Sequence, residues 1–191
     1  MDTMEAIAAR RSIRKFKDQP VPEDLIRQVL QAATLAPSGK NRQPWRFYIV
    51  QGEERAEMVR LMREGMAKLE EQGIGTGSAK WTAQVMERAP VTVFVFNPNA
   101  EWTNIPAETG DWMMNVVDVQ SVGAAIQNML LKAVDLGLGS LWICDVFFAS
   151  DELSAWLGES NQMIAAVSLG YPDEAPGPRP RKTVEEVTVW R

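Results

Sequence analysis

The most informative feature of this 191-residue chain is what it lacks: it contains no histidine and only one cysteine, Cys144. Without histidine, a Ser-His-Asp triad, a histidine-ligated zinc site and a histidine general base are all excluded. A single cysteine excludes an intrachain disulfide and a cysteine-rich metal centre. If the protein is an enzyme, we therefore expect no metal and no catalytic side chain, with the difficult chemistry supplied by a bound cofactor.

Long apolar runs are also missing, and no stretch of roughly 18 residues is apolar enough to predict a membrane-spanning helix. The opening residues, MDTMEAIAARR, are too acidic and hold too short an apolar run for a secretory signal peptide. A lone cysteine fits a reducing compartment. We therefore expect a cytoplasmic protein without membrane association, folded as a single domain over residues 1–191.

The chain is acidic overall, with a net charge of −5 and a pI of about 4.9. Binding to the phosphate backbone of nucleic acid needs many Lys and Arg residues, so we expect no nucleic-acid partner. The positive charge is uneven, and it is concentrated near the two ends of the chain at Arg10, Arg11, Arg14, Lys15, Lys17, Arg179, Arg181 and Lys182.

Helices and strands are both expected from the spacing of the apolar residues. Helix-prone segments are residues 3–11, 22–35, 53–71, 79–88, 116–136 and 150–157. Short β-branched or apolar runs predict strands at residues 45–51, 91–96, 141–144 and 163–172. These elements do not alternate in a regular βαβ rhythm, so an α+β fold with helices covering a mixed central sheet is favoured.

Two segments are expected to be irregular. Residues 97–115 read as a long loop, and a loop of this length is usually functional or covers something. The tail, residues 173–191, begins with a proline-rich stretch that excludes a helix there. We expect the tail to be an extended arm that reaches across a partner, with its VTVW ending able to add a strand to a sheet edge.

Two basic motifs are candidates for binding an anion. RRSIRKF, residues 10–16, places three arginines within a few residues of one another just beyond the first helix. Guanidinium groups match phosphate oxygens with paired hydrogen bonds, and Ser12 adds a hydroxyl donor, so the motif favours one phosphate monoester. PRPRK, residues 178–182, sets Arg179 and Arg181 on a stiff stem, which reduces the entropy lost on binding. The alternatives are a solvated basic patch and an exposed tail.

Two further motifs are candidates for contacting a planar ligand. In PSGKNRQPW, residues 37–45, Ser38 and Asn41 offer donors and acceptors that match the edge of a heteroaromatic ring system. The side chains of Asn41 and Gln43 could instead satisfy the backbone of their own loop. In LGLGSLWIC, residues 136–144, glycines let a strand end approach a planar ligand closely, although a simple helix-to-strand turn would use the same residues.

Taken together, these motifs resemble the nitroreductase family of oxidoreductases that depend on flavin mononucleotide (FMN). RRSIRKF followed by APSGKNRQPWRF is the most specific pair, and LGLGSLWI, GYP and PRPRK complete the order. The resemblance therefore covers essentially the whole chain. Cys144 and Asp145 depart from it, because many members have Gly or Glu directly after the Trp-Ile pair.

The resemblance implies an intertwined homodimer, with the C-terminal arm exchanged and two FMN sites at the subunit interface. The N-terminal arginines and the basic tail would hold the phosphate, the PSGKN loop would reach the flavin of the other subunit, and the LWI segment would line the isoalloxazine ring largely through its backbone. The implied cofactor-binding residues are Arg10, Arg11, Ser12, Arg14, Pro37, Ser38, Asn41, Leu141, Trp142, Ile143, Arg179 and Arg181.

The implied activity is ping-pong hydride transfer. NADH or NADPH reduces FMN and leaves, and an oxidised small molecule then enters the same cleft as electron acceptor. A nitroaromatic, a quinone, a free flavin and an activated alkene are all candidate acceptors, and no side chain need act as acid or base. Two alternatives stay open: a non-catalytic flavin-binding protein for storage or sensing, and a specialised flavoenzyme such as a reductive dehalogenase.

Overall fold

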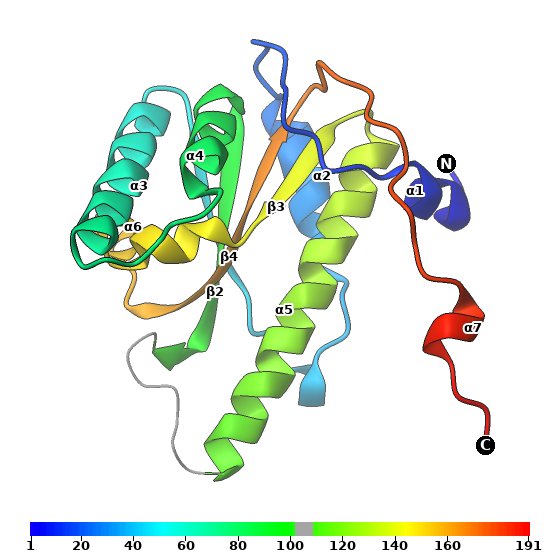
Figure 1. Ribbon diagram of the computed structural model, residues 1–191. Coiled ribbons are helices and arrows are strands. Elements are labelled where there is room, and N and C mark those ends of the chain that lie inside the picture. Colours follow the sequence, from blue (N-terminus) through cyan, green and yellow to red (C-terminus); the bar gives the residue numbers. More distant parts are fainter. Residues whose placement is uncertain (102–108) are drawn as a thin grey trace.

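A four-stranded sheet forms the centre of the molecule, with helices on both of its faces (Figure 1). The computed structural model describes residues 1–101 and 109–191. In chain order, its elements are α1 (Thr3–Ala9), α2 (Glu23–Thr34), the 3-10 turn η1 (Gly39–Asn41), β1 (Arg46–Gln51), α3 (Glu54–Glu71), α4 (Ala79–Arg88), β2 (Val91–Glu101), α5 (Thr109–Asp135), β3 (Gly139–Ile143), the 3-10 turn η2 (Asp145–Ala149), α6 (Ser150–Leu157), β4 (Asn161–Gly170) and α7 (Val184–Val187).

The strand order is β1-β2-β4-β3, and each neighbouring pair in this sheet is antiparallel. The predicted α+β class is confirmed, whereas the predicted mixed sheet is corrected for the described strands. The chain reverses direction through η2 and α6, so β4 returns antiparallel to β3. A single parallel bridge joins Ser12 to Ser140 at the outer edge of β3, and this bridge brings the N-terminal segment beside the sheet.

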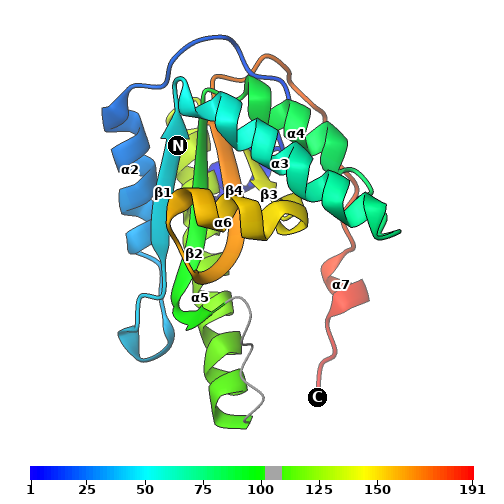
Figure 2. The same cartoon turned by 90° about the vertical axis from the view of Figure 1, so that its left-hand side faces the viewer.

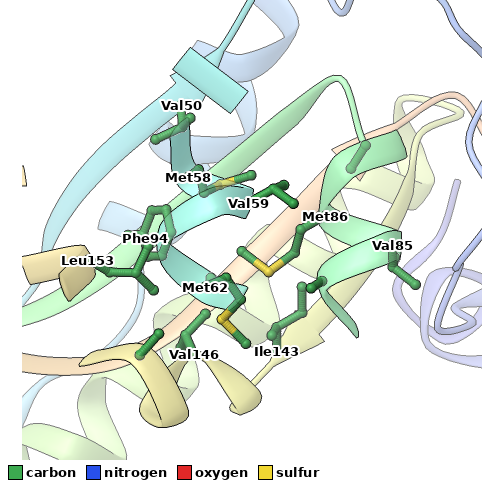
Figure 3. Packing of buried hydrophobic residues seen from close by; sticks show 14 of the residues in the cluster. Val50, Met58, Val59, Met62, Val85, Met86, Phe94, Ile143, Val146 and Leu153 are labelled. Atoms are coloured by element: carbon green, nitrogen blue, oxygen red, sulfur yellow. The ribbon is translucent and has the colours of Figure 1, made fainter. Parts of the chain in front are cut away.

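Side chains of the strands alternate between two hydrophobic cores, as the pleat of a strand requires. On β2, Phe94 belongs to the core with α3, α4 and α6, whereas Val93 belongs to the core with α2 and α5. Figure 2 shows α3, α4 and α6 in front of the sheet and α5 behind it. Burying one such side chain contributes roughly 1.5–3 kcal/mol. Figure 3 shows the first core, whose fully buried members include Met58, Met62, Met86, Phe94 and Leu153.

Helix α5 is the longest helix described, with 27 residues, and it crosses the sheet (Figure 1). Its sheet-facing residues recur three or four positions apart, as expected for one face of a helix. They are the fully buried Val122, Ala125, Ile126, Met129 and Ala133. None of the described helices is both long and apolar enough to cross a membrane.

The segment predicted to be a long loop, residues 97–115, is largely regular. β2 continues through Glu101, and α5 begins at Thr109 rather than near the start of the predicted helix 116–136. Residues 102–108 lie outside the described part of the chain, and so does the part of the prediction that falls on them. The prediction is therefore wrong at both ends of the segment.

The error arises because polar residues occupy buried positions at the end of β2. The side chain of Asn97 is fully buried, and its amide nitrogen donates to Asn115 Oδ1 at 3.2 Å and to Gln162 Oε1 at 3.3 Å. Buried polar groups are tolerated when they are hydrogen-bonded in this way. A pattern based on apolar residues ends the strand too early for this reason.

The VTVW ending of the tail forms no strand in this chain. Residues 184–187 form the short helix α7, and Trp190 beyond it is 87% exposed. The helix begins with a capping box, in which Thr183 Oγ1 accepts from the Glu186 N–H and the Glu186 carboxylate accepts from the Thr183 N–H. These reciprocal bonds favour a helical turn over an extended strand.

The segment that follows α1 pairs with the beginning of the C-terminal tail. The Lys17 N–H donates to the Tyr171 carbonyl, and the Asp173 N–H donates to the Lys15 carbonyl, both at 2.9 Å. Glu174 extends this pairing, because its carboxylate accepts from the backbone N–H groups of Arg14 and Lys15. The basic segment 10–15 and the proline-rich tail are thus held together.

Candidate functional site

A cavity of about 810 Å³ lies between the N-terminal segment, the proline-rich tail, α5 and β3. It is the place where the two predicted basic motifs meet, although they are separated by most of the sequence. Seven of the predicted site residues line it, namely Arg10, Arg11, Ser12, Arg14, Trp142, Arg179 and Arg181.

The cavity is strongly electropositive. Five arginines line it, and among the described residues no Asp or Glu does. Within residues 1–101 and 109–191, none of these arginines takes part in an ion pair, whereas Arg27, Arg46, Arg60 and Arg63 elsewhere on the surface do. Concentrated, uncompensated positive charge on an acidic protein marks a site for an anion.

The local sequence explains why the N-terminal arginines face the cavity. Helix α1 ends at Ala9, and the following residues are extended, so successive side chains point in opposite directions. Ile13 turns inward and is 7% exposed, and its N–H donates to the Ser140 carbonyl at 2.9 Å. Ser12 and Arg14 on either side therefore point toward the cavity.

Gly139 makes this arrangement possible, because a Cβ at that position would lie 2.9 Å from side-chain carbons of Ile13. A contact that short is incompatible with the present packing. The glycine in LGLGSLWI is thus needed where the N-terminal segment crosses the start of β3. The close approach at Gly139 is made by the chain itself, whereas the sequence analysis expected one by a planar ligand.

Arg11 combines a structural contact with a free donor. Its Nη1 donates to the carbonyls of Ala8 at 2.6 Å and Arg10 at 2.8 Å, at the C-terminal end of α1. Its Nε is buried and has no hydrogen-bond partner among the described residues, and the same holds for Ser140 Oγ. Buried donors left unpaired are costly, so Arg11 Nε is suited to an incoming acceptor.

The LWI segment contributes differently from residue to residue. The side chains of Leu141 and Ile143 are buried in the core of α3, α4 and α6, and only Trp142, 38% exposed, lines the cavity. The carbonyl of Ser140 points away from β4 toward Ile13, and backbone groups two residues apart on a strand point the same way. The N–H and C=O of Trp142 therefore also face the open edge of β3.

The PSGKN loop does not line this cavity. Its Gly39 N–H donates to Ser121 Oγ on α5 at 3.3 Å, whereas Leu130 of α5 lines the cavity. Nine residues separate Ser121 from Leu130, which is about two and a half helical turns. The loop and the cavity are therefore on opposite faces of α5, so Pro37, Ser38 and Asn41 are not brought together with the arginines in one chain.

The loop itself is held in an unusual conformation. Lys40, Asn41 and Gln43 have φ angles of 52°, 55° and 49°, a region that side chains other than glycine rarely adopt. Ser38 Oγ accepts from the Gln43 N–H at 3.0 Å, so part of the loop's polarity serves its own backbone. Several such residues in a row persist only where surrounding contacts enforce them.

Arg42 makes the strongest of those contacts, and its partner was not predicted from the sequence. Asp118 on α5 is buried, with 2% of its side chain exposed, and it pairs with Arg42 at 3.0 Å. Arg42 donates two hydrogen bonds to this carboxylate, and Asn99 Nδ2 adds a third at 3.1 Å. The available signal was an acidic residue within an otherwise apolar stretch of α5, since buried carboxylates need partners.

Two further residues at or near the cavity, Gln127 and Trp81, were not predicted from the sequence. Gln127 of α5 lines it, and the Arg14 guanidinium lies 5.3 Å from the centre of the Trp81 ring on α4. Asp145 is turned toward α4, where Ser78 and Thr82 donate hydroxyl hydrogen bonds to its carboxylate. Burial, and after it the charge of Asp145, raises the pKa of the Cys144 thiol, which keeps this residue in the unreactive thiol form.

Comparison with known proteins agrees with this arrangement. The sequence model of the nitroreductase family matches residues 7–171. The chain belongs to the nitroreductase family. The resemblance inferred from the motifs and the nitroreductase-like α+β fold are thereby confirmed.

Individual relatives of this nitroreductase-family chain match over nearly its full length. A Methanothermobacter thermautotrophicus protein named "Putative NADH dehydrogenase/NAD(P)H nitroreductase" is 33% identical over 184 residues, covering 94% of this chain and 82% of that protein. A Thermus thermophilus protein named "NADH dehydrogenase" is 30% identical over 203 residues, covering 100% and 97%. A solved structure, a "putative nitroreductase in complex with FMN" from Desulfovibrio desulfuricans, has a TM-score of 0.75 at 26% identity, covering 100% of this chain and 98% of that one.

Proposed function

We propose that this protein is an FMN-dependent oxidoreductase that uses NADH or NADPH to reduce a small-molecule acceptor. The observation that carries the proposal is the cavity lined by five arginines and no carboxylate. Family membership adds the cofactor class, because the Desulfovibrio relative is described as an FMN complex and the Methanothermobacter relative is named for NAD(P)H chemistry.

The residues present fit the phosphate of FMN. Arg11 Nε is a buried donor with no partner in the described part of the chain, and Ser12 offers a hydroxyl beside it. Arg10, Arg14, Arg179 and Arg181 complete the donor set. Guanidinium groups form paired, charge-assisted hydrogen bonds with phosphate, so the cavity can neutralise a dianion without any other cation.

The geometry supports a homodimer in which each chain serves two sites. The PSGKN loop lies on the opposite face of α5 from the arginine cavity, so one chain does not bring Pro37, Ser38 and Asn41 beside the arginines. A second copy would place its loop beside that flavin. The tail, residues 173–191, would then be an arm shared between subunits, which accounts for its exposed apolar residues Val189 and Trp190.

FMN supplies hydride transfer when it is bound, and the protein's residues position and isolate the reacting molecules. The arginines hold the anionic end of the cofactor, and the half-exposed Trp142 offers an aromatic face beside it. The backbone N–H and C=O at the edge of β3 can hydrogen-bond a polar ring edge. No acid or base from a histidine is available, so a proton for the acceptor comes from water or from the cofactor.

The acceptor class is a nitroaromatic, a quinone or a related oxidised molecule that enters the same cleft after the nicotinamide leaves. This order of events is ping-pong hydride transfer, and it requires only positioning of each partner in turn.

The deciding experiment is an anaerobic visible spectrum of the purified protein after FMN is added, recorded before and after NADH or NADPH. We expect a flavin band that bleaches with at least one donor. A band that persists with both donors would favour a storage or sensing protein instead. The absence of FMN binding would refute the assignment of the arginine cavity.

A further inference from the structure

A second cavity, of about 400 Å³, adjoins the arginine cavity on the side of α4. This volume lies within the range of roughly 300–1,000 Å³ that is typical of small-molecule sites. Arg14, Pro176 and Arg179 line both cavities, so the two are direct neighbours at these residues. A ligand whose phosphate is held by Arg14 and Arg179 could therefore extend from one cavity into the other.

One face of α4 provides the floor of the second cavity. Trp81, Gln84, Val85 and Arg88 line it, and their spacing of three and four residues places them on one side of the helix. Val85 is buried and anchors this face in the core, whereas Trp81 is 49% exposed. The indole ring is thus fixed at the cavity wall and still accessible to a ligand.

The second cavity is also electropositive. Arg14, Lys15, Arg88 and Arg179 line it, and none of them is in an ion pair with any described residue. Glu174 is the only acidic residue that the described part of the chain contributes to the lining, and its Oε1 accepts from the backbone N–H groups of Arg14 and Lys15. The charge of that carboxylate is directed at the backbone and leaves the cationic side chains available.

The lining of this cavity matches a purine nucleotide. It offers an exposed indole, several free cations and an amide side chain that both donates and accepts hydrogen bonds. The base can stack on Trp81, Gln84 can hydrogen-bond a polar ring edge, and Lys15 and Arg88 can neutralise a phosphate. We propose that this cavity binds the adenosine phosphate portion of a dinucleotide, which is either the adenylate half of flavin adenine dinucleotide (FAD) or that of NADPH. This inference rests on the proposed assignment of the cofactor phosphate to the adjoining cavity.

The test compares ligands with and without the adenylate on the full-length protein. In the first arm, the protein freed of flavin is titrated with FMN and with FAD, and binding is followed by flavin fluorescence. In the second arm, FMN-loaded protein is reduced in a stopped-flow experiment by NADPH and by reduced nicotinamide mononucleotide, which lacks the adenylate.

Arg88→Ala removes a cation that contacts only the second cavity, and Trp81→Leu removes the stacking surface, whereas Trp81→Phe keeps an aromatic face. Lys80→Ala is the matched control, because Lys80 lies on the same helix but pairs with Glu70 at 2.9 Å. We expect Arg88→Ala and Trp81→Leu to weaken the adenylate-bearing ligand about tenfold or more in one arm, with Trp81→Phe and Lys80→Ala near the wild type.

The arm that responds identifies the source of the adenylate, FAD or NADPH. The inference is overturned if no variant changes the binding of FAD or the reduction by NADPH. It is also overturned if each variant weakens the binding of FMN and FAD equally and slows reduction by NADPH and by the mononucleotide equally. The second result would mean that Trp81 acts only by orienting Arg14. Failure of the wild-type protein to bind FMN at all would instead refute the proposed function, so the two failures are distinguishable.

Discussion

Arg42 donates two parallel hydrogen bonds to the buried carboxylate of Asp118, from Nε to Oδ1 at 3.1 Å and from Nη2 to Oδ2 at 3.0 Å. This pair ties the strained PSGKN loop to the middle of α5. A carboxylate that loses its only ionic partner is left buried and uncompensated, which is strongly unfavourable. The loop conformation and the stability of the fold are therefore coupled at this point.

Arg42→Ala is expected to lower the free energy of unfolding by about 2–4 kcal/mol, because the carboxyl group of Asp118 would stay buried without this partner. Urea denaturation measures the change. Arg27→Ala is the control, since Arg27 and Glu23 form an exposed pair with side chains 75% and 70% accessible, and its loss should cost less than about 0.5 kcal/mol. Equal effects of the two substitutions would show that the Asp118 pair has no special role.

Arg14→Ala is expected to weaken FMN binding by about ten- to a hundredfold, the loss of one charge-assisted hydrogen bond to phosphate. Fluorescence titration of the flavin-free protein gives the affinity. Arg63→Ala should leave it unchanged, because Arg63 pairs with Glu87 on the surface at 2.9 Å, away from the cavity. Unchanged flavin occupancy in purified Arg14→Ala would remove Arg14 from the phosphate site.

Gly139→Ala is expected to destabilise the protein by about 1–3 kcal/mol and to weaken FMN binding at the same time. The added methyl group would push Ile13 off the start of β3, and the bridge between Ser12 and Ser140 depends on that contact. Gly75→Ala is a matched control, because a Cβ there meets no atom within 4 Å. A stable Gly139→Ala variant with normal FMN affinity would contradict the proposed role of this close approach.

Mixed dimers test whether the loop serves the neighbouring chain. One subunit would carry Arg14→Ala and Arg179→Ala, and the other would carry Ser38→Ala and Asn41→Ala. If the loop acts on the partner's flavin, a heterodimer has one site with all defects and one intact site, so activity returns to about half of the wild-type level. Purification through two different tags and a count of FMN per dimer give the result, and no recovery would assign each loop to its own chain.

Glu159 gives the fold a predictable pH dependence. Burial alone would raise the pKa of its carboxyl group, but hydrogen bonds from the Asn161 N–H, Arg46 and Tyr48 outweigh this, so the pKa lies below its ordinary value of 4.5. A lowered pKa in the folded state stabilises the protein above the unfolded value, and this contribution is lost as the pH falls through the folded value.

Glu159→Gln should therefore lower the free energy of unfolding by about 1–3 kcal/mol at pH 7, and the difference from wild type should shrink as the pH falls below 4.5. Urea denaturation at several pH values measures both effects. A difference that stays constant from pH 7 to pH 3 would show that the charge of Glu159 is not what the cluster stabilises.

The sequence predicted those features that depend on local pattern. Strands such as 91–96 were evident from continuous apolar residues, and the basic motifs were evident because several arginines stand close together in each. It did not predict that β2 continues past Asn97, because the burial of an asparagine depends on partners many residues away. Asp118 and Trp81 were missed for the same reason: their roles come from Arg42 and Arg14, which only the fold brings beside them.

The pairing of the two chain ends has a consequence for the order in which the site can be made. Arg10 and Arg11 are synthesised first, whereas Arg179 and Arg181 are synthesised after β4, the last strand of the sheet. A domain generally folds as a unit. The arginine cavity therefore cannot close before residue 181 has been added, and a chain that stops before Arg179 holds only three of the five arginines that line the cavity, namely Arg10, Arg11 and Arg14.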